Sequence, residues 1–247
     1  MSESSSPLAR LSILSATYWK EAVANLKSTR MLALAAMVVA LRALCKMLEI
    51  PLAPGLNINV AGIFNAVGAM IYGPVVGVLG AVVSDPLGYL LHPDGPYFLP
   101  FMLVDMSSSF LFGLFFWQQK LSVPRAMGAK FAVNMVSNIA LTSLIMKWYY
   151  FIFYGVEKAE AYNLINLTRI VKNLVMFPIE AILIAVVLGA LSPALYRLRL
   201  MKEKPDMKLS IRHYLLAAVL TLLAVGLVLF YVFFLKDFVK EHNFKLW

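Results

Sequence analysis

The sequence predicts an all-α integral membrane protein that crosses the bilayer several times. Hydrophobic residues make up 61% of the 247 residues and charged residues 14%, whereas a typical soluble domain has about 25% charged residues. Several apolar runs reach the roughly 20 residues that a helix needs to cross the hydrocarbon core. They lack the alternation of apolar and polar residues that the strands of a membrane barrel require. The composition therefore favours a bundle of transmembrane helices.

Seven apolar segments are long or apolar enough to be interpreted as spans. They are residues 31–50, 60–72, 74–91, 97–117, 127–153, 165–196 and 213–235. The second segment is short, and Gly73-Pro74 leaves a very short link to the third. Ahead of the first span, residues 8–29 carry apolar residues at helical spacing beside Trp19 and several cations. This pattern is typical of an amphipathic helix that lies in the membrane interface.

The distribution of basic residues predicts the topology. The basic segments are the N-terminus, 118–130 and 197–212, whereas the segments 51–59, 92–96 and 155–161 are poor in positive charge or mixed. The positive-inside rule places the first set in the cytoplasm and the second set outside. The N-terminus is therefore predicted to be cytoplasmic, and this sorting explains most of the net charge of +9 without nucleic-acid binding. A seventh span would put the basic C-terminal tail outside, which mildly opposes the rule.

Charged side chains inside the spans need a reason, because each costs about 2.5–3.5 kcal/mol near mid-bilayer. Arg42 and Asp85 each lie about eleven residues into an outward-running span, or roughly 16 Å up at 1.5 Å per residue. We expect them to meet, either as a structural ion pair between helices or as polar groups that face a ligand. Lys46 lies nearer the outer end of its span, where snorkelling to the surface would account for it.

A polar stripe at helical spacing marks the sixth span. It is formed by Arg169, Lys172, Asn173 and Glu180. Snorkelling explains the two cations, but it does not explain the two deeper polar residues. Trp148 and Tyr149 lie at the outer end of the fifth span, where they fit either the interfacial aromatic belt or a ring that stacks on a ligand.

Taken together, these residues predict a site for a flat, polar, heteroaromatic molecule in the outer half of the bundle. Rings would stack on such a ligand, carboxylates or amides would match its donors, and cations would match its anionic groups. The candidate ligand-binding residues are Arg42, Asn65, Asp85, Tyr97, Phe98, Phe101, Trp148, Tyr149, Arg169, Lys172 and Asn173.

Sequence signatures of catalysis are absent. The chain has no G-x-x-x-x-G-K-[ST] loop, no H-E-x-x-H and no G-x-S-x-G, and its three histidines and single cysteine are too scattered for a metal cluster. We therefore expect no catalytic residue, metal or cofactor. No convincing repeat of two halves is visible, which favours a receptor or subunit that takes its energy from a partner. Ala36 and Ala40 form a small-xxx-small pattern in the first span, which suits close packing with a partner helix or within the chain.

The chain resembles the substrate-binding S components of energy-coupling factor (ECF) vitamin transporters, most closely the folate-specific ones, over about residues 15–198. The resemblance rests on the order of LALAAMVVALRALCK, IPLAPGLNI, SDPLGYLL, HPDGPYFLPF and RIVKNLVMFPIEAIL. It implies a six-transmembrane-helix S-component fold over residues 31–198 in a bacterial cell membrane. It further implies that this domain binds a folate-like molecule from outside and docks through Ala36 and Ala40 on a transmembrane coupling subunit with two ATPase subunits, which hydrolyse the ATP.

The sequence departs from this resemblance in two respects. Residues 213–235 form an additional C-terminal transmembrane helix, which would be an accessory anchor or contact a partner. The remaining segments are then a cytoplasmic tail with the amphipathic helix at residues 1–30, a basic cytoplasmic loop at 199–212 and a C-terminal tail at 236–247. Asp105 stands where the family leads us to expect a small or hydroxylated residue, and Asp94 also replaces an expected uncharged residue.

Two alternative functions stay open at this point. The chain would serve as an S component for another vitamin or precursor if the departures at Asp94 and Asp105 change the ligand. In a different class, it would be a small membrane enzyme or assembly factor, although the missing motifs disfavour this hypothesis.

Overall fold

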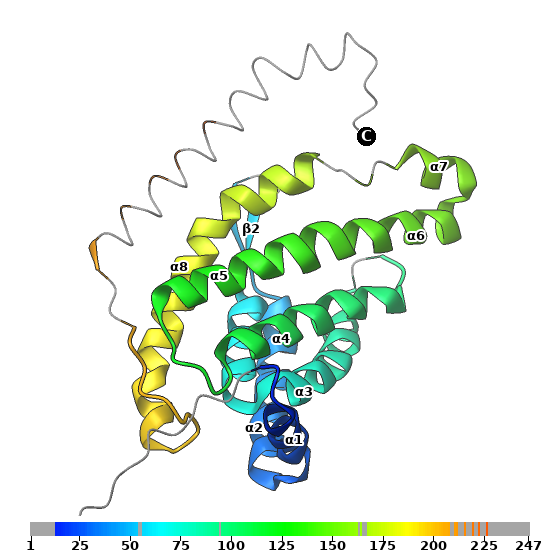
Figure 1. Cartoon of the computed structure of the whole chain (residues 1–247). Coiled ribbons are helices and arrows are strands. Elements are labelled where there is room, and N and C mark those ends of the chain that lie inside the picture. The colour runs from blue at the N-terminus through cyan, green and yellow to red at the C-terminus, as the bar shows by residue number, and fades with distance from the viewer. Residues whose placement is uncertain are drawn as a thin grey trace, which may run out of the picture.

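The computed structural model describes residues 13–53, 56–93, 95–162, 164, 167–207, 210, 211, 215, 219, 222 and 226. In chain order its elements are α1 (Ala16–Ala24), η1 (Asn25–Lys27), α2 (Thr29–Lys46), β1 (Glu49–Ala53), β2 (Leu56–Asn59), α3 (Val60–Leu91), η2 (Leu99–Phe101), α4 (Met102–Phe116), α5 (Val123–Val133), η3 (Asn134–Leu141), α6 (Thr142–Tyr154), α7 (Val156–Ala161) and α8 (Leu167–Arg197). These elements are helical apart from one short β-hairpin (Figure 1). Most of the predicted seventh span and Asp94 lie outside the described residues, so the predictions about them stay untested.

Long apolar helices dominate the described part of the chain. Four are long and apolar enough to cross a membrane: Val60–Leu91, Leu99–Phe116, Val123–Tyr154 and Arg169–Arg197. A fifth span results if α2 is counted together with the N-terminal helical segment, from which it is bent by 80°. The prediction of an all-α, multi-span membrane protein is confirmed for this part of the chain.

Helix α3 consists of two segments that meet at a kink. Gly73, with φ 85° and ψ −178°, interrupts the helix and is followed by Pro74. Val38 of α2 lies against Gly68 of the first segment, and the adjacent Val39 lies against Gly80 of the second. Both segments therefore pack at the same level of α2, as two antiparallel helices would. This arrangement agrees with the predicted spans 60–72 and 74–91.

The fifth predicted span forms one continuous helical rod in Figure 1, made of α5, η3 and α6. Pro124 lies in the first turn of α5, where its missing N–H costs nothing. The middle of the rod, Asn134–Leu141, is a π-helix. A π-helical stretch has a wider turn than an α-helix and is often found at functional sites.

Helix α1 packs across one end of the bundle. The side chain of Ser15 caps it by accepting a hydrogen bond from the Thr17 N–H at 3.2 Å. Tyr18 is fully buried, and its ring meets Trp117 edge-on with 4.9 Å between centroids. An amphipathic helix was predicted here. Its apolar face contacts the protein, while its position relative to a membrane interface stays a prediction.

The segment after α8 folds back onto the same end of the bundle. Leu200 is buried in the core, and the N–H of Asp206 donates to the carbonyl oxygen of Leu121 at 2.9 Å. Lys202 Nζ lies 2.5 Å from Glu21 of α1, and its hydrogen bond lowers the pKa of the Glu21 carboxyl. Residues 198–207 therefore tie α1 to the loop between α4 and α5.

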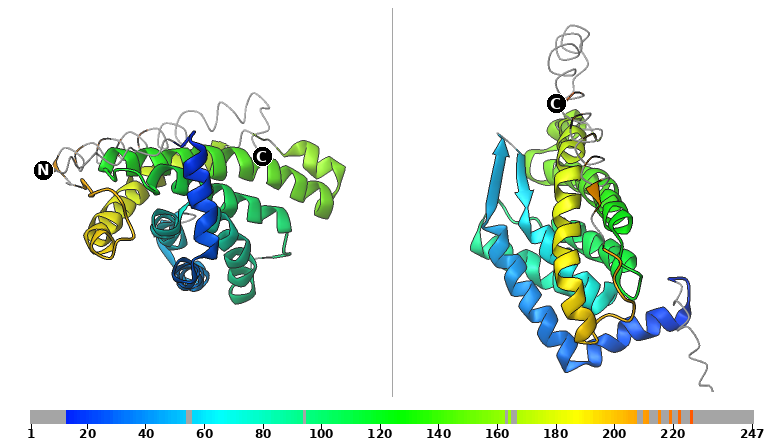
Figure 2. Two further views of the ribbon diagram at one scale, coloured as in Figure 1. Left: turned by 60° about the horizontal axis from the view of Figure 1, so that its bottom comes forward. Right: turned by 90° about the vertical axis from the view of Figure 1, so that its left-hand side faces the viewer.

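The hairpin corrects the prediction of a plain loop at 51–59. Strands β1 and β2 pair antiparallel, with Glu49 opposite Asn59. The first span, predicted to run to residue 50, ends at Lys46 because the chain turns into β1. In the right-hand view of Figure 2, the hairpin stands at the opposite end of α2 from α1.

The apolar core fills the half of the bundle nearest α1. It joins α2, α3, α4, α5 and α8 through Val38, Met70, Tyr72, Phe112, Phe116, Ala126, Ile184 and Leu188. The half nearest the hairpin is not filled in this way, and it is there that the polar residues of the spans gather.

Substitution of Gly73 by alanine is expected to destabilise the protein more than substitution of Gly155. Both glycines have nearly the same dihedrals, φ 85° with ψ −178° or 175°, a region that costs other residues about 1–3 kcal/mol. A Cβ at Gly73 would also lie 2.8 Å from the Trp117 ring, whereas a Cβ at Gly155 meets nothing within 4 Å. Thermal unfolding in detergent should therefore rank Gly73→Ala below Gly155→Ala and both below the parent. Equal stabilities for the two variants would contradict the close packing of the kink on Trp117.

Candidate functional site

A cavity of about 850 Å³ opens in the hairpin half of the bundle. Its size lies in the range of roughly 300–1,000 Å³ that is usual for small-molecule sites. It is lined by residues of α2, both segments of α3, α4, the α5–α6 rod and α8. Most lining residues recur at helical spacing, as in Asn138, Thr142, Met146 and Tyr149 of the rod. Each helix thus turns one face toward the cavity.

Ten of the eleven predicted site residues line this cavity. They are Arg42, Asn65, Asp85, Tyr97, Phe98, Phe101, Tyr149, Arg169, Lys172 and Asn173. Trp148 does not line it, and its side chain is 50% exposed. Both Trp148 and Tyr149 were predicted from their position at the outer end of the fifth span, but neighbouring residues of a helix point about 100° apart.

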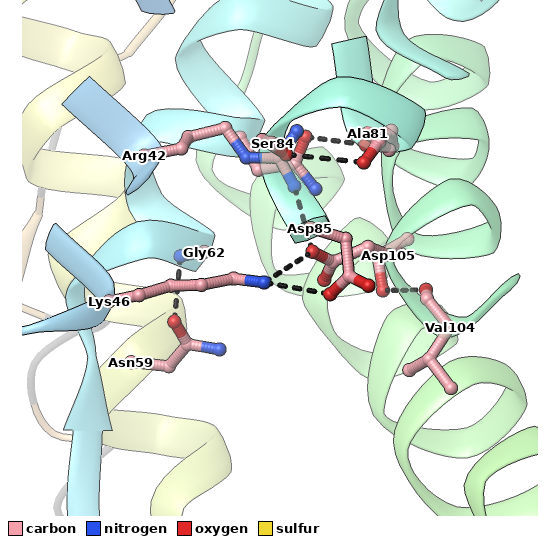
Figure 3. Close-up of polar contacts among 12 residues, drawn as sticks. Arg42, Lys46, Asn59, Gly62, Ala81, Ser84, Asp85, Val104 and Asp105 are labelled. Carbon is pink, nitrogen blue, oxygen red and sulfur yellow. Dashed lines mark hydrogen bonds and ion pairs between the residues drawn. The ribbon is translucent and has the colours of Figure 1, made fainter. Parts of the chain in front are cut away.

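Four charged residues form one network at the bottom of the cavity, drawn in Figure 3. Lys46 Nζ lies 2.9 Å from Asp85 Oδ1 and 3.2 Å from Asp105 Oδ2. Arg42 Nη2 lies 3.4 Å from the same Asp105 oxygen. The hydroxyl of Tyr97 donates to Asp85 Oδ2 at 3.1 Å. The network joins α2, α3 and α4, and its two cations balance its two carboxylates.

This network corrects two predictions. Arg42 pairs with Asp105 rather than with Asp85, and Lys46 bridges two carboxylates instead of snorkelling to the surface. The register follows from a close approach of helices, since a Cβ at Gly88 would lie 2.3 Å from Lys46 Cδ. Lys46 therefore sits beside the turn that carries Asp85. Arg42 and Asp85 lie equally far along their spans, and this did not reveal that Lys46, one helical turn beyond Arg42, is the partner of Asp85.

A second ion pair lies in the wall formed by α5 and α8. Lys130 Nζ and Glu180 Oε2 are 2.6 Å apart, with side chains 6% and 9% exposed. Glu180 Oε1 also accepts from the backbone N–H of Asn59 at 3.2 Å. The pair thereby links α5 and α8 to the base of the hairpin. Lys130 was assigned to a basic loop, although its position seven residues inside α5 makes it a partner for Glu180.

Hydrogen bonds between amides connect the α5–α6 rod to α8. Asn138 Nδ2 donates to Asn134 Oδ1, and Asn134 Nδ2 donates to the carbonyl oxygen of Asn173, both at 3.1 Å. Arg169 Nη1 donates to Ser143 Oγ at 3.0 Å. Asn138 lines the cavity but was not among the predicted site residues, although its i, i+4 spacing from Asn134 was visible in the sequence. The π-helix that positions Asn138 gives no recognisable sequence signal.

Three aromatic rings form an aromatic wall in the lining of the cavity. The ring centroids of Phe98, Phe101 and Tyr149 are separated by 5.8 Å, 5.6 Å and 6.0 Å. Phe98 is buried, and its edge-on contacts fix the other two rings. Such a cluster presents ring faces and edges on which a flat ligand can pack.

Within the part of the chain that the structure describes, no three His, Cys, Asp or Glu side chains gather in a way that could hold a metal ion. The chemistry that this lining offers is that of binding, through ion pairs, amide hydrogen bonds and aromatic packing.

Comparison with known proteins identifies relatives of the chain. The family model for the S component of ECF-type riboflavin transporters matches residues 25–197, well over half of the chain. The folate transporter FolT of Clostridium novyi (strain NT) is 31% identical over 132 residues, which cover 53% of this chain and 72% of the relative. FolT of Leuconostoc mesenteroides subsp. mesenteroides is 28% identical over 153 residues, covering 62% and 80%.

A solved structure shares the fold. The crystal structure of FolT bound with folic acid matches with a TM-score of 0.50 and 25% sequence identity. The match covers 62% of this chain and 88% of that one. The similarity therefore extends over nearly the whole of the solved protein, while part of this chain lies beyond it.

Replacement of Lys130 by methionine is expected to lower the free energy of unfolding by about 3–5 kcal/mol, because it leaves the Glu180 carboxylate buried without its cation. The double variant Lys130→Met/Glu180→Gln should lose less stability than the single variant, since it leaves no uncompensated charge. Unfolding in detergent, compared in a double-mutant cycle, measures the difference. If the stability losses of Lys130→Met and Glu180→Gln add up to the loss of the double variant, the two side chains do not depend on each other.

Proposed function

Because the chain belongs to the S-component family of ECF-type transporters, we propose that it binds folate or a folate derivative as the substrate-binding subunit of an ECF-type vitamin importer. It would take the vitamin from outside a bacterial cell and deliver it through a transmembrane coupling subunit driven by two ATPase subunits. The observation that carries the choice of folate is the charge of the cavity lining, supported by the similarity to folate transporters.

Among the described residues of the lining, cations outnumber carboxylates. Five cations, Arg42, Lys46, Lys130, Arg169 and Lys172, stand against three carboxylates, Asp85, Asp105 and Glu180. The three carboxylates lie within ion-pair distance of the first three cations. The other two cations, Arg169 and Lys172, both belong to α8. These residues lie near the N-terminal end of α8, which adds the positive end of the helix dipole.

This excess charge fits folate better than riboflavin. The glutamate tail of folate carries two carboxylates, whereas riboflavin is uncharged at neutral pH. An anionic tail near Arg169 and Lys172 would put the pterin ring toward the aromatic wall and the charged network. Phe98, Phe101 and Tyr149 would then pack on the ring.

The partner subunits are proposed from family membership and from one exposed surface. Ala36 and Ala40 are both exposed on α2, and small residues at this spacing let another helix approach closely. We place this face against the coupling subunit. We also propose, from the basic segments at the α1 end of the bundle, that the N-terminus is cytoplasmic and that the hairpin faces outside.

An S component for another vitamin is the second candidate, and the riboflavin family model favours it. The two candidates differ in the charge of the ligand. Competition between folate and riboflavin for the same site therefore separates them.

Titration with folic acid, followed by quenching of tryptophan fluorescence, should give a dissociation constant below the micromolar range, with no competition from riboflavin. Arg169→Ala should weaken binding about tenfold or more, because it removes a charged hydrogen-bond donor from the site. Lys147→Ala is the matched control: this cation is exposed on α6 and does not line the cavity. Saturable binding of riboflavin, without binding of folate below the micromolar range, would reject folate as the substrate.

Leucines at Ala36 and Ala40 should leave folate binding intact and abolish uptake into vesicles that contain the partner subunits. The reason is steric, since the larger side chains would hold a docked helix away from α2. Met37→Phe, which adds bulk on a neighbouring exposed face, should affect neither property. Normal uptake by the double-leucine variant would place the docking surface elsewhere.

A further inference from the structure

The two carboxylates of the charged network differ in how many of their oxygens accept hydrogen bonds. Asp85 accepts from Lys46 Nζ with Oδ1 and from the Tyr97 hydroxyl with Oδ2. Its side chain is 13% exposed. Asp85 therefore has both oxygens occupied and holds α2, α3 and the segment after α3 together.

Asp105 contacts the cations of the network through one of its two oxygens, Oδ2. Its Oδ2 is buried and lies within ion-pair distance of both Arg42 and Lys46, but it receives no well-aligned hydrogen bond. The Asp105 side chain is nevertheless 28% exposed on the cavity that it lines. Since Oδ2 is buried, Oδ1 is the carboxylate oxygen that a ligand can reach.

Arg42 lies on the buried side of this carboxylate, with its Nη2 3.4 Å from Oδ2. Its side chain is 2% exposed, and its Nε and Nη1 have no hydrogen-bond partner. A buried guanidinium with unused donors creates a positive electrostatic environment for Asp105, the carboxylate with which it forms an ion pair. The unpartnered atoms of this corner, Arg42 Nε and Nη1 and Asp105 Oδ2, are buried, so a ligand meets the other oxygen of Asp105. Lys46, whose side chain is also 28% exposed, is the donor beside this acceptor.

We propose that Asp105 is a specificity-determining residue that selects a 2-amino-4-oxopyrimidine head group over a 2,4-dioxopyrimidine. The 2-amino group and N3–H of a pterin are adjacent donors that match the exposed carboxylate oxygen. A flavin or lumazine carries an oxygen at position 2, which would face the carboxylate with its lone pairs. The site would therefore both attract the amino compound and repel the oxo compound. This inference rests on the proposed function and names the residue that makes the site choose between the two vitamin classes.

The test compares folic acid with its analogue in which the 2-amino group is replaced by a 2-oxo group, so that the tail is unchanged. The parent protein should bind folic acid about 10- to 100-fold more tightly, as expected for one hydrogen bond to a charged group. In Asp105→Asn this ratio should fall to about threefold or less, because an amide can donate to the 2-oxo group. Asp85→Asn is the matched control: it removes the same charge from the same network, and its ratio should stay close to that of the parent even if both affinities fall.

The results separate a failure of the proposed function from a failure of the role of Asp105. A parent protein that binds neither compound in the micromolar range rejects the proposed function itself. A parent that binds both compounds equally, or an Asp105→Asn variant that keeps the parental ratio, overturns the role of Asp105 and leaves the proposed function standing. If Asp105→Asn is not recovered as folded protein, Arg42→Gln/Asp105→Asn removes both charges of the buried pair, and the same ratio decides the question.

Discussion

Charged side chains inside an apolar bundle must compensate one another, and this constraint determines where the helices of the protein meet. Isolated charges at mid-bilayer are costly, so Lys46 draws Asp85 of α3 and Asp105 of α4 to α2, and Lys130 draws Glu180 of α8 to α5. Together the two sets of ion pairs involve five helices. They frame the hairpin half of the bundle, while an apolar core fills the other half. The result is a cavity with polar walls that lies next to a closely packed apolar core.

The family to which the chain belongs guides the interpretation of this cavity. The chain belongs to the S-component family, and the similarity to folate transporters extends over most of their length. The walls differ in character: an aromatic cluster at Phe98, Phe101 and Tyr149, a cationic end at Arg169 and Lys172, and a network at the floor that is neutral overall. Folate has a matching sequence of groups, with a flat head and an anionic tail. We propose that the fit of charge, rather than the apolar contacts, separates folate from riboflavin.

Most of the fold and much of the candidate site could be predicted from the sequence, because they depend on local pattern. Apolar runs predicted the helices, and Gly73-Pro74 predicted the link between the segments of α3. Charged and polar residues inside the spans, together with aromatic residues near their outer ends, predicted ten residues of the cavity lining. The pairings could not be predicted, because they depend on register between helices. The contact of Gly88 with Lys46 moves Asp85 one turn away from Arg42, and the π-helix turns Asn138 inward. The β-hairpin was missed because residues 49–59 include two prolines and lack a clear alternation.

If the cavity holds folate, the protein should retain this vitamin through purification. Protein extracted in mild detergent from cells that contain both vitamins should release folate or a folate derivative on denaturation. Mass spectrometry of the released fraction should detect it in a near-stoichiometric amount, with riboflavin at background level. Release of riboflavin or another uncharged compound in stoichiometric amount would contradict the match between an anionic tail and the cations of α8.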